Sequence, residues 1–165
     1  MHWKLSALYI TIFLFFIVLA QPLLAQPIID WRIFGNSTPY VNSPGGVCLI
    51  NDRIYIVGSA IREGIRSGEI VVREKSTGTL LKVWRGEKAF HVCTVVKGIL
   101  YVGGEEIRVF SPDLHELGRV EVDYEIQSIT TDGEYLYIAG YMYVTKEDSV
   151  WVVEKRDLDL KLLKR

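Results

Sequence analysis

A short apolar motif that contains one tyrosine and one glycine occurs three times in the chain. The copies are Arg53–Ser59 (RIYIVGS), Ile99–Glu105 (ILYVGGE) and Tyr135–Tyr141 (YLYIAGY). Their tyrosines lie 46 and 36 residues apart and correspond in the order Tyr55, Tyr101, Tyr137, as do Gly58, Gly104 and Gly140. A strand that recurs about every 40 residues, with further strands between the copies, is typical of the blades of a β-propeller.

The residues around each copy predict a unit of four antiparallel strands, and helices are nearly absent from the pattern. The second and third strands of a unit are apolar without alternation, which indicates burial on both faces, as between packed blades. We expect Ser43–Gly46 to be a turn and residues 62–68 to be a polar loop. The fourth strand of the last unit is expected at Leu158–Leu163. The predicted blades span approximately residues 45–86, 87–123 and 124–165.

The N-terminal segment, residues 1–25, is excluded from the predicted fold because it has the character of a targeting sequence. Lys4 precedes an almost wholly apolar run from Leu5 to Ala20. Its length lies between that of a signal peptide and that of a membrane-spanning helix, so both interpretations stay open. Cleavage after Ala25 or Ala20 releases the domain, and an uncleaved segment anchors it. Both place residues 26–165 outside the cytoplasm, with membrane contact only through residues 1–25.

One further strand, Pro27–Phe34, precedes the first unit and has no partners in the repeat. Its Trp31-Arg32 resembles Trp84-Arg85 at the end of the first unit, so it resembles a fourth strand without its first three. Propellers have about four to eight blades, and three blades leave apolar faces uncovered. We therefore expect an all-β, incomplete propeller with an N-terminal orphan strand. It is either part of a longer propeller or completed by self-association.

The charge composition argues against binding of nucleic acid as the function of this chain. The formal net charge is −1, and no cluster of lysine and arginine interrupts the pattern.

Three stretches carry a resemblance to a known class of proteins. Trp31–Ser37 (WRIFGNS), Gly45–Ala60 (GGVCLINDRIYIVGSA) and Glu69–Trp84 (EIVVREKSTGTLLKVW) are similar to secreted bacterial and archaeal β-propeller repeat proteins. The resemblance covers roughly Trp31 to Leu163 and implies architecture rather than activity, because such repeats occur in many unrelated proteins.

The function expected on this basis is binding of a protein or a glycan, without catalysis. The alternatives are a fragment of a secreted propeller hydrolase, lyase or dehydrogenase, and a truncated product without independent activity. Residues Ser76–Leu81 with Trp84 also resemble the Thr-Gly…Trp signature of quinone-dependent propeller dehydrogenases. The other two units have Pro112-Asp113-Leu114 and Arg156-Asp157-Leu158 at this place, so no quinone or other cofactor is expected.

Cys48 and Cys93 are the only cysteines, and each follows a valine in a similar short sequence, VCL and VCT. We take them as equivalent positions of neighbouring inner strands, with Ser128 as the third counterpart. A disulfide is permitted outside the cytoplasm if the Cα atoms lie about 4.4–6.8 Å apart. The alternative is two small buried side chains that fill narrow positions.

No catalytic or metal site is predicted from the remaining polar residues. His91 begins an inner strand but has no second histidine beside it, and the inner strands otherwise offer hydroxyls from Thr94, Ser128 and Thr130. Three carboxylate pairs occur without the Asp-x-Asp-x-Asp-Gly spacing of a calcium loop, so we interpret them as solvated charges: Glu105-Glu106, Asp123 with Glu125, and Asp132 with Glu134.

Four tyrosines of the last unit share one strand face because they alternate with apolar residues. They are Tyr135, Tyr137, Tyr141 and Tyr143. They either form a binding surface or pack against a neighbouring blade. We expect packing, with Tyr141 and Tyr143 near enough to a loop to reach a rim.

Overall fold

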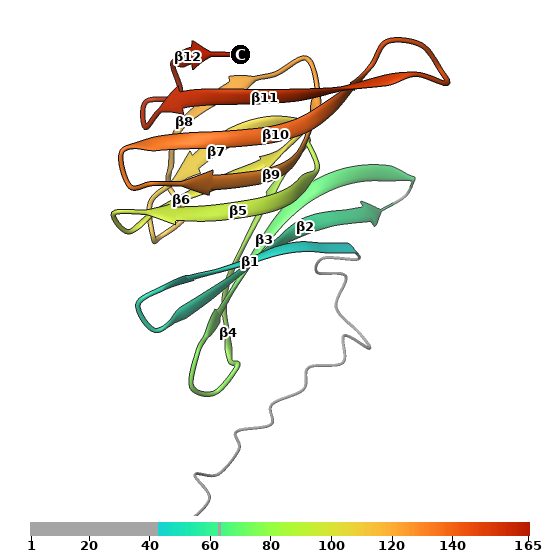
Figure 1. The fold of residues 1–165 in the computed structure, drawn as a ribbon. Helices are drawn as coiled ribbons and strands as arrows, with labels where there is room; N and C mark the ends of the chain where they lie inside the picture. Colours follow the sequence, from blue (N-terminus) through green and yellow to red (C-terminus); the bar gives the residue numbers. More distant parts are fainter. Residues whose placement is uncertain (1–42, 63) are drawn as a thin grey trace, which may run out of the picture. The chain divides into compact units, whose positions relative to one another are not determined.

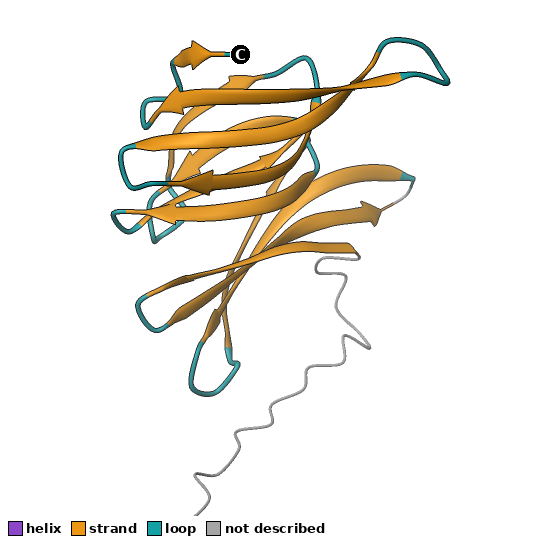
Figure 2. Ribbon diagram, in the orientation of Figure 1, coloured by secondary structure: helices purple, strands orange, loops and turns teal. Residues whose placement is uncertain are grey.

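The structure is a computed structural model that describes residues 43–62 and 64–165. This part of the chain forms three antiparallel sheets of four strands each, and it contains no helix (Figures 1 and 2). Each sheet uses four consecutive strands, so the predicted all-β architecture of three four-stranded units is confirmed. The segment 1–25 and the orphan strand Pro27–Phe34 lie outside the described residues.

The three sheets follow one another along the chain in the same internal order. The first sheet contains β1 (Ser43–Ile50), β2 (Arg53–Arg62), β3 (Ile65–Glu74) and β4 (Leu80–Gly86). The second contains β5 (Phe90–Val96), β6 (Ile99–Gly104), β7 (Glu106–Phe110) and β8 (Glu116–Glu121). The third contains β9 (Glu125–Thr131), β10 (Tyr135–Tyr143), β11 (Ser149–Asp157) and β12 (Leu162–Lys164).

The turn expected at Ser43–Gly46 is wrong, because these residues begin β1 and pair with β2. The two glycines serve a close approach between sheets instead. A Cβ atom added to Gly45 would lie 2.2 Å from the carbonyl oxygen of His91, and one on Gly46 would lie 2.9 Å from the amide nitrogen of Cys93. Backbone atoms cannot yield at such distances, so only glycine lets β1 approach β5 here.

The polar loop expected at residues 62–68 is also wrong. The β2–β3 ladder continues as far as the pair Arg62 and Ile65, which leaves a tight turn that contains Gly64 with φ of 79°. Polar residues such as Ser67 gave a loop-like composition, but antiparallel pairing satisfies their backbone groups.

The turn before the last strand lies later than the sequence indicated. Arg156 and Asp157 still belong to β11, and β12 begins only at Leu162 rather than at Leu158. Leu160 has φ of 68° and is buried. Leu114 has φ of 58° and is buried at the same place in the second sheet. A non-glycine residue rarely adopts this conformation, and both leucines use it to point an apolar side chain into the core.

The strand register confirms that Tyr55, Tyr101 and Tyr137 are equivalent. Each lies in the second strand of its sheet, and its partners in the first strand are Cys48, Thr94 and Thr130 respectively. In the third strand the corresponding partners are Val72, Val109 and Lys155. The register therefore assigns structurally equivalent residues throughout the three sheets.

The repeated glycine marks an irregularity in the first strand of a sheet. Register shifts occur at Pro44/Gly46, at Phe90/Val92 and at Ala139/Gly140. A Cβ atom on Gly104 would lie 2.0 Å from the carbonyl oxygen of Ala89, and one on Gly140 would lie 2.1 Å from that of Glu125. The glycine thus accommodates a bulge that brings the neighbouring strand close.

Each sheet has two faces, which we distinguish by the position of the repeated tyrosine. The forward face is the one that carries the repeated tyrosine, and the rear face is the opposite one. The forward face of the first sheet packs on the rear face of the second in one core, and the second packs on the third in the same way. The central strands β6 and β7 are consequently buried on both sides.

The repeated tyrosine also joins neighbouring sheets by a hydrogen bond. The hydroxyl of Tyr55 donates to the carbonyl of Pro112 at 2.7 Å, and that of Tyr101 donates to the carbonyl of Leu158 at 3.1 Å. Both acceptors lie in the turn between the third and fourth strands of the next sheet. In the third sheet, the hydroxyl of Tyr137 donates to Asp132 of its own sheet at 2.8 Å.

This difference gives a matched pair of substitutions. We expect Tyr101→Phe to lower the free energy of unfolding by about 1 kcal/mol, because a buried bond between sheets is lost. Tyr137→Phe should change it by less than about 0.5 kcal/mol, because its partner Asp132 is exposed. Urea unfolding followed by tryptophan fluorescence measures both values. Equal losses would show that the bond between sheets adds nothing.

Candidate functional site

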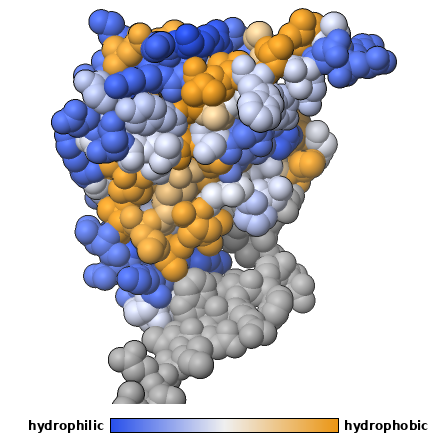
Figure 3. Space-filling view, viewed as in Figure 1, coloured by the Kyte–Doolittle hydropathy of each residue, from blue (hydrophilic) through white to orange (hydrophobic). Residues whose placement is uncertain are grey.

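The forward face of the third sheet exposes apolar side chains at a position that the other two sheets bury. In the register, Val153 is equivalent to Ile70 and Ile107, which are fully buried, yet 62% of Val153 is exposed. Trp151 lies two residues before it on the same face and is 90% exposed. Figure 3 shows hydrophobic residues at the surface along the β10–β11 hairpin. Such exposure of large side chains is typical of an interaction surface.

A shallow hollow of about 230 Å³ lies on this face. Trp151, Val153 and Tyr141 surround it, and Ala139 forms part of its floor. Lys155 lies on the same face, with its ammonium group 3.6 Å from the ring centre of Tyr135 and 5.5 Å from that of Tyr137. The face therefore combines aromatic, aliphatic and one cationic group, with Thr130 and Ser128 exposed on the adjoining strand β9.

A second hollow, of about 350 Å³, lies at the rim where the chain enters β9 and leaves β10. It is lined by Tyr141 and Tyr143, whose rings meet edge to face at 5.1 Å, together with the carboxylates of Glu105, Asp123 and Glu125. Tyr143 is 65% exposed. Within the described residues, the prediction that Tyr143 packs on a neighbouring blade is therefore wrong. The structure instead places this side chain at a rim.

Glu125 connects this hollow to His91, which sequence reasoning left without a partner. The hydroxyl of Tyr141 donates to Glu125 Oε2 at 2.7 Å, and this bond raises the pKa of the tyrosine. His91 Nε2 lies 3.0 Å from Glu125 Oε1, but the geometry is not that of a hydrogen bond, and this buried nitrogen has no other partner among the described residues. The pairing arises because β5 and β9 are adjacent first strands.

The carboxylates interpreted as solvated loop charges have different environments. Glu106 is buried in β7 and accepts from Arg108 Nε at 2.5 Å, so that interpretation is wrong for this residue. Asp123 pairs with Arg165. Asp132 is exposed and accepts bonds from the backbone amides of Glu134 and Tyr135, which lower its pKa to about 2.

Sequence reasoning missed that every sheet buries one glutamate paired with an arginine. The pairs are Glu69 with Arg85, Glu106 with Arg108, and Glu154 with Arg156. Glu154 also accepts from the hydroxyl of Tyr124 at 3.0 Å. Burial and the charge of Glu154 raise the pKa of that tyrosine. A signal was present in the apolar neighbours of these residues in the third strands, such as Val-Val-Glu before Lys155.

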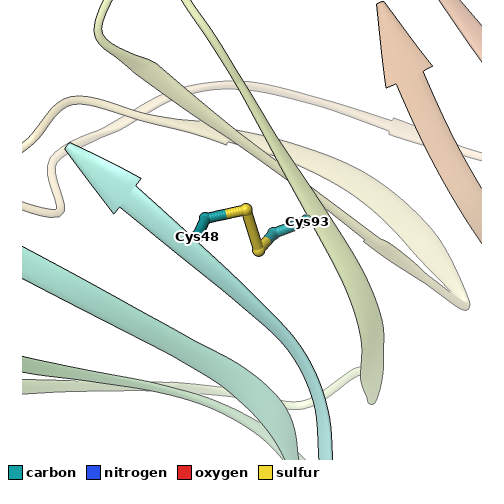
Figure 4. Close-up of a disulfide and its surroundings, with 2 residues drawn as sticks. All are labelled: Cys48 and Cys93. Carbon is teal, nitrogen blue, oxygen red and sulfur yellow. A yellow bond between two sulfur atoms is a disulfide. The ribbon is translucent and has the colours of Figure 1, made fainter.

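The two cysteines are bonded to each other and link the first sheet to the second. Cys48 on β1 and Cys93 on β5 point toward one another, with Cα atoms 6.2 Å apart (Figure 4). Their assignment as equivalent positions is wrong. Cys48 pairs with Tyr55, whereas Cys93 pairs with Val102, one residue away from Tyr101. A shift of one residue changes the face, so Cys48 is on a forward face and Cys93 is on the rear face that meets it.

The register also corrects the third counterpart. Thr130 is equivalent to Cys48, and Ile129 is equivalent to Cys93, because they pair with Tyr137 and Ile138. Ser128 pairs with Ala139 and corresponds to neither cysteine. In the part of the chain that the structure describes, no three His, Cys, Asp or Glu side chains are grouped so as to hold a metal ion. A search of the same residues finds no helix of the length and apolarity needed to cross a membrane.

Comparison with known proteins supports the architecture alone. No protein-family model and no curated protein sequence matches the chain. Among solved structures it is similar to the WD40 domain of Pan2 from Neurospora crassa, with a TM-score of 0.55 and 9% sequence identity over 72% of this chain. The chain has a β-propeller-like fold. It spans 38% of the length of that WD40 domain, and at this identity the likeness shows the fold and no activity.

Proposed function

We propose that the chain is an extracytoplasmic, non-catalytic module that binds a protein partner on the forward face of its third sheet. The observation that carries the proposal is the exposure of Val153 at a position that the other two sheets bury between blades, with the exposed Trp151 beside it on the same face. Propeller domains of the WD40 type commonly serve protein interactions, which agrees with this assignment.

The chemistry of the face favours a protein over a small molecule. Exposed tryptophan and tyrosine are enriched among the residues that contribute most to protein–protein affinity. The hollow beside Trp151 is shallow and open rather than enclosed, as expected for a surface that receives side chains of a partner.

Two observations support an extracytoplasmic location. Residues 1–25 have the composition of a signal peptide or anchor, and the cysteine pair is one that persists in an oxidising compartment.

A glycan is the second candidate, favoured by the rim hollow. Tyr143 offers an exposed ring on which a sugar can stack, and Glu105 and Glu125 offer acceptors for its hydroxyl groups. The two hollows share Tyr141, but Trp151 lines only the first and Tyr143 only the second, so probes at these two residues distinguish the candidates.

Site-specific photo-crosslinking tests the proposal. A benzophenone amino acid replaces Trp151 in the full chain, produced in the cells that encode it, and adducts are identified by mass spectrometry. We expect a protein adduct at position 151 at least tenfold more abundant than at Leu117, an exposed apolar control on β8. The same probe at Tyr143 reports a glycan adduct if the second candidate is correct. Equal protein adducts at positions 151 and 117 would contradict the proposal.

A further inference from the structure

We propose that the protein partner of the third sheet docks an acidic turn on the forward face, so that a carboxylate of the partner pairs with Lys155. The inference rests on the proposed function and names the chemistry of the partner surface. It follows from the charges at three equivalent places in the repeat, of which the third lacks its counterpart among the described residues.

At both contacts between sheets, one end of the forward face receives a turn of the next sheet. The hydroxyl of Tyr55 donates to the carbonyl of Pro112, which lies in the turn between β7 and β8. The hydroxyl of Tyr101 donates to the carbonyl of Leu158, which lies in the turn between β11 and β12. Both tyrosines are buried, whereas Tyr137 at the equivalent position of the third sheet stays partly exposed. The end of the third sheet that carries Tyr137 is therefore the place where a turn of a partner is expected.

The first of these contacts also pairs opposite charges. Arg53 lies two residues before Tyr55 on the same face, and its Nη1 donates to Asp113 Oδ1 at 2.7 Å. Asp113 directly follows Pro112, so the turn that accepts from the tyrosine also brings a carboxylate to the cation. The hydrogen bond from Arg53 lowers the pKa of Asp113, as a cation does when it stabilises a carboxylate.

The second contact has the acidic turn but no cation on the face that receives it. Ile99 occupies the position of Arg53, two residues before the repeated tyrosine. Asp159 directly follows Leu158 and is the counterpart of the acid in the first contact. Its side chain is exposed and forms no ion pair among the described residues. An ion pair between face and turn thus forms where the forward face supplies a cation.

The third sheet supplies a cation at the same place, but from a different strand. Tyr135 is equivalent to Arg53, because both lie two residues before the repeated tyrosine. The ammonium group of Lys155 lies 3.6 Å from the ring centre of Tyr135. Its positive charge therefore stands near the position that the guanidinium stem occupies in the first sheet. In the described part of the chain, Lys155 forms no ion pair with a carboxylate.

The charge of Lys155 selects an acidic partner over an apolar one. At the two contacts within the chain, Leu114 and Leu160 share cores with the valines that are equivalent to Lys155. A leucine over the lysine would bury an ammonium group without an acceptor, which is costly unless a carboxylate accompanies it. Asp132 does not supply this carboxylate, because it accepts from two backbone amides and from the hydroxyl of Tyr137. The carboxylate is thus expected from the partner.

Reversal of the charge at Lys155 tests the inference. The benzophenone amino acid is placed at position 151 of the full chain, in the cells that encode it, and the protein adduct is quantified. We expect Lys155→Glu to lower this adduct at least tenfold, because two carboxylates then face each other. Lys155→Arg keeps the charge and should retain at least half of the adduct. Lys97→Glu, which reverses an exposed charge in a turn of the second sheet, is the matched control and should leave the adduct unchanged.

A second measurement needs no change of charge. The benzophenone amino acid replaces Tyr135, where it keeps an aromatic ring beside Lys155, and the crosslinked peptide of the partner is sequenced by mass spectrometry. We expect an aspartate or a glutamate within two residues of the attachment point. Peptides captured by the same probe at Leu117 give the background.

The outcomes separate this inference from the proposed function. A protein adduct at position 151 that Lys155→Glu leaves unchanged would overturn the acidic turn and retain the binding face. A partner peptide at position 135 without an acidic residue near the attachment point would do the same. A crosslink from position 135 to another part of this chain would also overturn the inference, because the turn would not belong to a partner. No adduct above that of Leu117 would overturn both.

Discussion

Replacing Glu154 by alanine is expected to lower the free energy of unfolding by about 3–5 kcal/mol. Glu154 and Arg156 are both almost fully buried in β11, and Glu154 Oε2 accepts from Arg156 Nε at 2.7 Å. Removal of the carboxylate leaves the guanidinium buried with only the carbonyl of Leu160 as its remaining acceptor in the described residues. Tyr124 loses its partner as well. Urea unfolding measured by tryptophan fluorescence gives the change.

Two further variants separate the buried charge from lost packing. Glu134→Ala removes an exposed carboxylate and should change the free energy of unfolding by less than about 0.5 kcal/mol. Glu154→Met combined with Arg156→Met removes both charges while it keeps apolar volume, and it should recover most of the loss. A double variant as unstable as Glu154→Ala would show that packing rather than an unpaired charge explains the effect.

Loss of the disulfide is expected to lower the free energy of unfolding by about 4 kcal/mol, from the entropy of a closed loop of this length. Cys48 and Cys93 are 45 residues apart in sequence, and the bond joins the first two sheets directly. The paired substitution Cys48→Ala with Cys93→Ala is preferred to serine because Cys48 belongs to the apolar core. Urea unfolding of the oxidised chain and of the double variant gives the difference.

The reductant dithiothreitol provides the control for the disulfide. It should destabilise the natural chain by nearly the same amount as the paired substitution and should leave the double variant unchanged. If reduction changes neither protein, the thiols are not bonded in solution, and the link between the first two sheets depends on apolar contact alone.

The sequence predicted the architecture because each sheet repeats the same local chemistry. Tyrosine and glycine mark the second strand of every sheet, and the two turns Asn51-Asp52 and Lys97-Gly98 delimit the first hairpins. The prediction of a turn at Ser43–Gly46 failed because glycine occurs both in turns and where two backbones approach closely. Composition alone does not distinguish these two cases, because the second depends on the position of the neighbouring strand.

The relation between the two cysteines shows what a motif comparison cannot supply. The contexts of Cys48 and Cys93 are similar, but similarity of letters aligned them one residue out of register. Counting back from the two-residue turns gives Thr94, and not Cys93, as the equivalent of Cys48. The same counting identifies Val47 as the equivalent of Cys93. Side-chain direction in a strand depends on this count alone, so a single residue decides whether a disulfide is feasible.

The candidate site was less accessible to sequence reasoning for a physical reason. Trp151 and Val153 belong to an apolar strand that resembles Ile70–Val72, so the pattern predicts burial for both. Whether a face is covered depends on a neighbouring sheet and not on the strand itself. The contact of Glu125 with His91 likewise depends on the adjacency of β5 and β9, which no local pattern encodes.

Photo-crosslinking from the forward face of the third sheet in the full chain tests the central claim most directly. The claim is that this face binds a protein partner. We predict that a benzophenone amino acid at position 153, where the equivalent Ile70 and Ile107 are buried between sheets, gives a protein adduct of one discrete mass. Trp151→Asp should abolish this adduct without loss of the folded near-ultraviolet signal. Adducts of equal abundance from position 153 in the natural chain and in the Trp151→Asp chain would contradict the account.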